Sequence, residues 1–166
     1  MFSYFIDVFE RALKKIHYLC AENNRTFGKM NIDHIKNGLD KVDNLANRIG
    51  IELVSTPDPD ICVARMKVDE RNRQPFGYLS GGASLALAET LAGCGSYAIC
   101  PEALACVGQN VHGNHIHPAK EGETVIAIAK IIHQGKSSHV WQVDIKNEKG
   151  DLVSSISVTN HIIYKQ

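Results

Sequence analysis

The chain has 166 residues, of which 44% are hydrophobic and 22% charged, and its 18 acidic residues balance 18 basic ones. This length suits a single domain, and the balanced charge gives no global attraction to nucleic acid or to an anionic membrane. The five cysteines contain no Cys-x-x-Cys pair, so buried thiols are favoured over a disulfide framework.

The first 29 residues are predicted to form a helical extension. Apolar residues recur at helical spacing from Phe2 to Leu19, and most charges lie on the opposite face. Asp7 and Glu10 interrupt this stretch, whereas a secretory signal begins with positive charge and continues with an unbroken apolar run. We therefore expect a cytoplasmic protein. Because the polar face carries both charge signs, the extension is expected to dock on the domain, another subunit or a partner rather than on a membrane.

The remaining residues, 30–166, are predicted to form one domain that opens with a helix over 31–47. Apolar residues recur there at helical spacing. Two strands are then predicted over 51–56 and 61–68, because both stretches are rich in strand-forming residues and a turn sequence with two prolines separates them.

A second, longer helix is predicted from Ala83 to Ala98, after a bend rich in glycine and proline. Its 16 residues are almost all apolar or small, and a helix that is apolar all round is predicted to be buried. Such a helix runs about 24 Å, which is too short to span a bilayer. Ser80 stands at its start and is predicted to cap the first turn.

Glu89 is the only carboxylate in this apolar helix. A glutamate is rarely buried without a partner, and loss of solvation raises the pKa of a carboxyl group. Glu89 either reaches an edge of the core, meets a partner from elsewhere in the chain, or serves as a catalytic carboxylate at the mouth of a cleft. We favour the catalytic interpretation, because perturbed titratable groups mark reactive sites.

The rest of the chain is predicted to form strands joined by polar turns. The four strand candidates are residues 104–116, 123–133, 138–146 and 152–164. Trp141 lies on an alternating strand and is predicted to pack in the core. Since the chain shows no βαβ alternation, the predicted fold class is α+β, with an antiparallel sheet wrapped around one long central helix.

Three stretches carry a resemblance to a known family. They are QPFGYLSGGASLALAE, GQNVHGNHIHPAKEG and HQGKSSHVWQVDIKNEKGDLVSSISVT. Together they resemble the hotdog-fold acyl-CoA thioesterases, in the branch that acts on 1,4-dihydroxy-2-naphthoyl-CoA and 4-hydroxybenzoyl-CoA. The resemblance covers about residues 30–164. It implies a hotdog fold, hydrolysis of an acyl-CoA with an aromatic or bulky acyl group, a possible place in menaquinone biosynthesis, and no cofactor, since coenzyme A belongs to the substrate.

The resemblance also implies roles for individual residues. Glu89 matches the family's nucleophile or general base, and Gly81 matches the glycine whose backbone N–H polarises the thioester carbonyl. Gln74 matches a glutamine that hydrogen-bonds near the thioester. Glu89 lies eight residues beyond Gly81, roughly 12 Å along the helix. The family resolves this separation by facing the Glu of one subunit with the Gln and Gly of the other, so a homodimer is implied, and commonly a homotetramer.

The chain departs from the family signature QPFGxLHGGAS at one position, where Ser80 replaces the histidine. A serine can orient a substrate but cannot carry a proton at neutral pH as an imidazole can. This replacement keeps open a non-catalytic acyl-CoA binding protein as the alternative function. It also argues against a hotdog hydratase, which pairs a His with an acid.

Further residues are expected to contact the substrate or the coenzyme. They are Arg73, Gly82, His115, His117, Lys136 and Ser137, with Lys120 as another phosphate contact. A zinc site at His112, His115 and His117 is disfavoured, because on a strand His115 and His117 share a face while His112 faces the other way, and further ligands are lacking. No Ser-His-Asp or Cys-His arrangement is recognisable.

Overall fold

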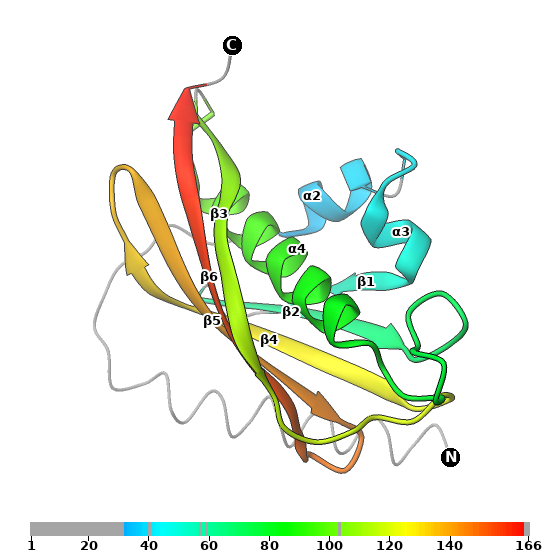
Figure 1. Ribbon diagram of the computed structural model, residues 1–166. Coiled ribbons are helices and arrows are strands. Elements are labelled where there is room, and N and C mark those ends of the chain that lie inside the picture. Colours follow the sequence, from blue (N-terminus) through cyan, green and yellow to red (C-terminus); the bar gives the residue numbers. More distant parts are fainter. Residues whose placement is uncertain (1–31, 40, 57, 59, 103, 165–166) are drawn as a thin grey trace.

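A computed structural model describes residues 32–39, 41–56, 58, 60–102 and 104–164, and the predicted N-terminal extension lies outside these residues. One curled antiparallel sheet partly encloses a long helix, α4 (Gly81–Ile99) (Figure 1). The strands run in the spatial order β1-β2-β4-β5-β6-β3. They are β1 (Ile51–Val54), β2 (Ile61–Lys67), β3 (Leu104–His115), β4 (Thr124–Gln134), β5 (Ser138–Asn147) and β6 (Leu152–Tyr164). The predicted α+β architecture is confirmed.

The prediction of one helix over 31–47 is wrong, because two short helices occupy this stretch. They are α2 (Ile32–Leu39) and α3 (Leu45–Ile49). The side chain of Asn44 accepts a hydrogen bond from the backbone N–H of Asn47 and so caps α3. Both asparagine side chains also donate to the carbonyls of Leu39 and Val42. Polar side chains thus satisfy the backbone at the break, where the apolar spacing alone predicts a continuous helix.

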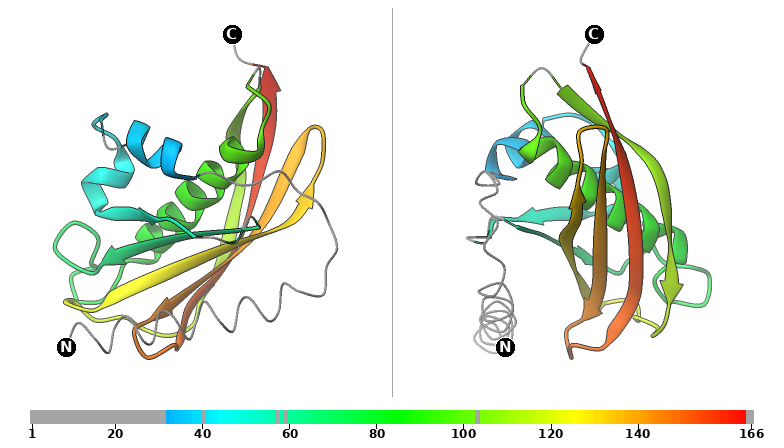
Figure 2. Two further views of the ribbon diagram at one scale, coloured as in Figure 1. Left: turned by 180° about the vertical axis from the view of Figure 1, so that it is seen from behind. Right: turned by 90° about the vertical axis from the view of Figure 1, so that its left-hand side faces the viewer.

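The core lies between α4 and the concave face of the sheet. On β5, buried and half-buried residues alternate without a break, which is the pattern of a strand with one face against the core. Trp141 is fully buried, as predicted. Helices α2 and α3 lie on the same side of the sheet as α4 (Figure 2), and both contact α4.

A buried polar cluster fixes the C-terminal half of α4 on the sheet. The indole N–H of Trp141 donates to Ser96 Oγ at 2.8 Å, and the side-chain amide of Asn160 donates to the same oxygen at 2.9 Å. Asn160 also donates to the Ala92 carbonyl at 3.0 Å. A Cβ at Gly95 would lie 2.6 Å from the indole ring, so glycine is what lets Trp141 pack directly against the helix.

The prediction that α4 is buried all round is wrong for the single chain, since only one side of the helix meets the sheet. The buried residues are Ser84, Leu87, Ala88, Leu91, Ala92, Cys94, Gly95 and Ser96. On another face, Gly82, Glu89 and Tyr97 are exposed, and Ala86 and Gly93 are half-buried. These five residues form a stripe along the helix, which we call the open stripe of α4.

His139, near the start of β5, is a buried titratable group. The side chain is 4% exposed, and its Nδ1 atom has no hydrogen-bond partner within the part of the chain that the structure describes. Burial lowers the pKa of His139, and the neighbouring His133 lowers it further. The fold therefore favours the neutral imidazole.

Replacing Ser96 with alanine is expected to destabilise the fold. The indole N–H of Trp141 would lose its acceptor while remaining buried, which costs about 1–3 kcal/mol in the free energy of unfolding. Urea unfolding of Ser96→Ala against wild type measures this loss. Ser157→Ala is the control, because Ser157 lies on the face of β6 that points away from the core. It should change stability by less than about 0.5 kcal/mol. Equal stability of the two variants would contradict the anchoring role.

Stability is also expected to fall in mild acid through His139. Because the folded-state pKa lies below the unfolded value of about 6.5, the unfolded chain binds more protons as the pH drops through that value. Thermal unfolding of wild type between pH 7.5 and 5.5 should therefore show a larger loss of stability than that of His139→Gln. Parallel curves for the two proteins would show that this imidazole titrates alike in both states.

Candidate active site

A cavity of about 410 Å³ opens at the N-terminal end of α4. Its walls come from the loop before α4, the first turn of α4, the end of β3 with the loop that follows it, and the start of β6. Four of the residues expected to act on the substrate line it, namely Gln74, Gly81, His115 and His117. Residues that lie far apart in the sequence, from Gln74 to Ser154, thus meet at one cavity.

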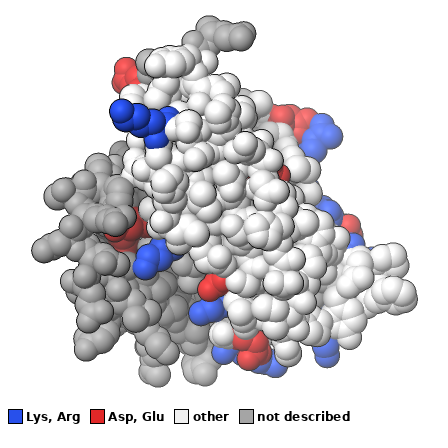
Figure 3. All heavy atoms as spheres, turned by 60° about the vertical axis from the view of Figure 1, so that its left-hand side comes forward, with Lys and Arg blue, Asp and Glu red and all other residues white. Residues whose placement is uncertain are grey.

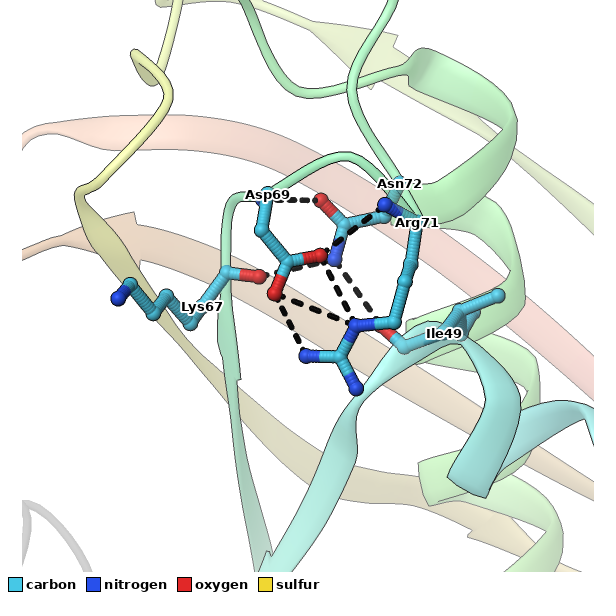
Figure 4. A network of polar contacts seen from close by, with 5 residues as sticks. All are labelled: Ile49, Lys67, Asp69, Arg71 and Asn72. Carbon is cyan, nitrogen blue, oxygen red and sulfur yellow. Dashed lines mark hydrogen bonds and ion pairs between the residues drawn. The ribbon is translucent and has the colours of Figure 1, made fainter.

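The loop that carries Gln74 is held by Asn72, which is nearly fully buried. Its side-chain amide donates to the carbonyls of Ile49 and Lys67, and its side-chain oxygen accepts from the backbone N–H of Asp69 (Figure 4). The guanidinium of Arg71 binds the Asp69 carboxylate and lowers the pKa of that carboxyl group. These bonds fix the entry to α4 before any substrate arrives.

Gln74 itself begins a tight turn. Its backbone N–H donates to the Tyr78 carbonyl at 2.8 Å, and its carbonyl accepts from the N–H of Gly77 at 3.0 Å. Gly77 has a φ of 78°, a conformation that glycine adopts without strain. The turn thus holds the backbone of Gln74 in place where this residue lines the cavity.

Gly81 lies against an imidazole at the start of α4. A Cβ at this position would lie 2.5 Å from Nε2 of His115, so a larger residue would displace the ring. The Nδ1 atom of His115 is 3.0 Å from Ser154 Oγ, which orients the ring. The first amides of a helix lack intrahelical acceptors and carry its positive end. This part of the cavity is therefore suited to a developing negative charge.

The prediction that the Ser80 side chain caps α4 is wrong. Ser80 occupies the N-cap position, but its hydroxyl makes no capping hydrogen bond. The hydroxyl lies over Gly82 instead, 3.7 Å from where a Cβ of that glycine would be. The carbonyl of Ser80 accepts from the N–H of Ser84 at 3.1 Å. Neither Ser80 nor Gly82 lines the cavity.

Glu89 lies outside the cavity, on the open stripe of α4. Its side chain is exposed, because the single sheet covers only one side of the helix. Glu89 does not line the cavity of its own chain. The carboxylate rests against β3, where its Oε1 atom occupies the space that a Cβ of Gly108 would fill. In one chain, the carboxylate and the cavity are therefore on different parts of α4.

The comparisons with known proteins agree on one family. The pattern of the Thioesterase superfamily matches residues 76–154. The Bacillus subtilis protein ComA2, which is named as an esterase, is 41% identical over 128 residues, which cover 76% of this chain and all of ComA2. The chain belongs to the thioesterase superfamily.

Two further thioesterase relatives have more specific names or a solved structure. The 1,4-dihydroxy-2-naphthoyl-CoA hydrolase of Escherichia coli is 39% identical over 63% of this chain and 76% of its own length. The crystal structure of thioesterase HI1161 from Haemophilus influenzae matches with a TM-score of 0.75 and 32% identity, over 84% of this chain and 93% of that chain. The fold is thus the hotdog fold of these enzymes, as the sequence resemblance implies.

The expected coenzyme contacts do not all gather at the cavity of this thioesterase. Lys136 and Ser137 lie in the turn between β4 and β5, where the Ser137 carbonyl accepts from the N–H of Ile162. This turn is far from the start of α4 (Figure 1). Arg73 forms an ion pair with Glu121, with 3.2 Å between Nε and Oε1. The sequence predicts these residues as one group of contacts, because it contains no information on where each turn lies in the folded chain.

Other reactive groups of this thioesterase are poorly suited to catalysis. Within residues 32–164 as described, no group of three or more His, Cys, Asp or Glu side chains is arranged to hold a metal ion. Cys94 is buried, and burial raises its pKa to about 12 and that of Cys106 to about 11. Since the thiolate is the nucleophile, neither cysteine is a candidate nucleophile near neutral pH.

None of the described helices is long and apolar enough to cross a membrane.

Proposed function

We propose that this thioesterase hydrolyses an acyl-CoA to a free acid and coenzyme A, in a site that two subunits build together. The observation that carries the proposal is the division of the reacting groups along α4. The helix start, with Gly81, faces a cavity lined by Gln74, whereas Glu89 is exposed on the open stripe. Each subunit thus has half of what the reaction requires.

The first half supports binding and polarisation of the thioester. The Gly81 amide, at the positive end of a helix of 19 residues, would donate to the carbonyl oxygen and stabilise the oxyanion that forms in the transition state. The side chain of Gln74 would hold the carbonyl or the attacking water. His115 and His117 lie at the same cavity and would contact the coenzyme.

The second half supplies the carboxylate. As a general base, Glu89 would take a proton from water while the water oxygen attacks the thioester carbon, and collapse of the tetrahedral intermediate would expel the coenzyme A thiolate. As a nucleophile, Glu89 would form a mixed anhydride and expel the thiolate first, and water would then cleave the anhydride to release the acid. Both routes consume one water and need no further cofactor.

A homodimer would bring the two halves together. The open stripe contains the small residues Gly82, Ala86 and Gly93, which would permit close approach of a second chain. The neighbouring edge strand β3 supports the same assembly, since it contains no Lys, Arg, Asp or Glu, whereas exposed edges usually carry charges that prevent pairing. The surface over β3 and β6 carries few charged side chains (Figure 3). Pairing of two dimers would give the homotetramer that the resemblance implies.

The position of the β4–β5 turn fits this arrangement. Gly108, which contacts Glu89, pairs with Asn160, which pairs with His139, which pairs with Gln134. The turn with Lys136 and Ser137 follows Gln134, so it lies at the end of the sheet against which Glu89 rests. In a dimer, these residues would reach the coenzyme from the subunit that supplies the carboxylate.

An aromatic or bulky acyl group is the preferred substrate class. The cavity includes apolar and aromatic side chains, among them Tyr78, Ile116 and Val153. The relative named 1,4-dihydroxy-2-naphthoyl-CoA hydrolase supports a bicyclic aromatic acid and a place in menaquinone biosynthesis.

The replacement of the signature histidine by Ser80 favours a second candidate, a protein that binds acyl-CoA without hydrolysing it.

Release of free thiol from a panel of aromatic and aliphatic acyl-CoAs tests the reaction. We expect wild type to hydrolyse aromatic members fastest and Glu89→Gln to lose at least about 100-fold in kcat, because the acid–base or nucleophilic group is gone. Glu102→Gln, which removes an exposed carboxylate just beyond α4, is the matched control and should retain activity. Equal turnover by wild type and Glu89→Gln on every substrate would leave the binding protein as the function.

Mixing two inactive variants tests the shared site. Glu89→Gln keeps an intact cavity, and Gln74→Ala keeps an intact carboxylate. If the groups act across an isologous interface, one of the two sites in each mixed dimer is intact, so the purified mixed dimer should have about half of wild-type activity. Co-expression with two affinity tags and purification of the mixed dimer measures this. No recovery in the mixed dimer would show that both groups act within one chain.

A further inference from the structure

We propose that Gly108, on β3, is the positioning residue for the Glu89 carboxylate. The inference rests on the proposed function, because it concerns how the catalytic group is held. A Cβ at Gly108 would overlap Oε1 of Glu89 and would lie 3.4 Å from Cδ and 3.7 Å from Cγ. The whole end of the glutamate side chain therefore rests against this glycine.

Space, rather than backbone conformation, is the reason for glycine at this position. The glycines with positive φ among the described residues are Gly50, Gly77, Gly122 and Gly150, so Gly108 has a backbone that an alanine also adopts. Its Cβ direction is toward α4, because Gly108 pairs with the buried Asn160 and directly paired residues share a face of the sheet. An alanine here would fit the strand and collide only with Glu89.

The strand is irregular at the same point. The register of β3 against β6 shifts between Gly108 and Asn110, which leaves Gln109 as the extra residue of a bulge. A bulge bends the strand and re-aims its neighbours, and bulges are frequent beside active sites. Here the bulge adjoins Gly108, the residue of β3 against which the carboxylate rests.

The cross-strand partner of Gly108 holds the helix above it. Asn160 donates to the carbonyl of Ala92 and to Ser96 Oγ. Ala92 is three residues beyond Glu89, less than one helical turn. This pair of residues therefore has two effects on the site. Asn160 holds α4 on the sheet, and Gly108 leaves the space into which the Glu89 carboxylate extends.

The substitution Gly108→Ala isolates this role. A misplacement of about 1 Å can cost about 100-fold in rate, so kcat should fall about 10- to 100-fold while KM stays within about twofold of wild type. Oligomer size and thermal stability should be unchanged. Gly38→Ala is the matched control, because it adds the same atom where nothing lies within 4 Å.

A shorter carboxylate gives the rescue. Glu89→Asp removes the overlap, so adding Gly108→Ala to Glu89→Asp should lower kcat by less than about threefold. The double-mutant cycle would then be non-additive, as expected for residues in contact. Crystal structures of wild type and Gly108→Ala should show the carboxylate of Glu89 displaced by about 1 Å or more, a reading that does not depend on activity.

Several outcomes would overturn the inference and leave the proposed function standing. They are an unchanged kcat in Gly108→Ala, an additive double-mutant cycle, a loss of activity that comes with a change in oligomer size, and an unmoved carboxylate in the crystal. Wild-type protein without activity on any acyl-CoA would instead overturn the proposed function. In that case, the position of the carboxylate in the two crystals still decides whether Gly108 holds it.

Discussion

The packing of α4 against the sheet determines where every other part of the site lies. Glycine at position 95 lets the indole of Trp141 contact the helix, and Ser96 accepts hydrogen bonds from both Trp141 and Asn160. Buried polar groups are costly unless they are paired. These bonds form only when α4 lies at one position along the sheet. They therefore specify where the helix lies as well as holding it there.

Two distinct environments follow from this placement. At its first turn, α4 presents free amides to a cavity formed with the end of β3 and the start of β6. Two turns later, its open stripe carries a carboxylate over Gly108. Because the two groups lie about two turns apart on one helix, Glu89 does not reach the cavity of its own chain. The proposed dimer would bring the carboxylate of one subunit to the cavity of the other.

The loop before α4 holds Gln74 in place at the cavity. The side chain of Asn72 forms hydrogen bonds with three backbone groups, and the bonds of a turn hold the backbone of Gln74. The buried cysteines, with raised pKa values, belong to the core. In the proposed reaction, the acting groups are a glutamine, a backbone amide and a carboxylate, and neighbouring residues hold each of them in place.

The sequence by itself determined the elements and the family, because strand alternation, turn chemistry and the QPFG…GGAS…AE spacing are local properties. It also identified Gln74, Gly81 and His115, which do meet at one cavity. Only the tertiary structure decided that 31–47 divides into two helices, that Glu89 is exposed, and that Gly108 lies beneath it. Those facts depend on how a curled sheet crosses a helix, and a residue's spacing along the chain contains no record of which face that crossing leaves open.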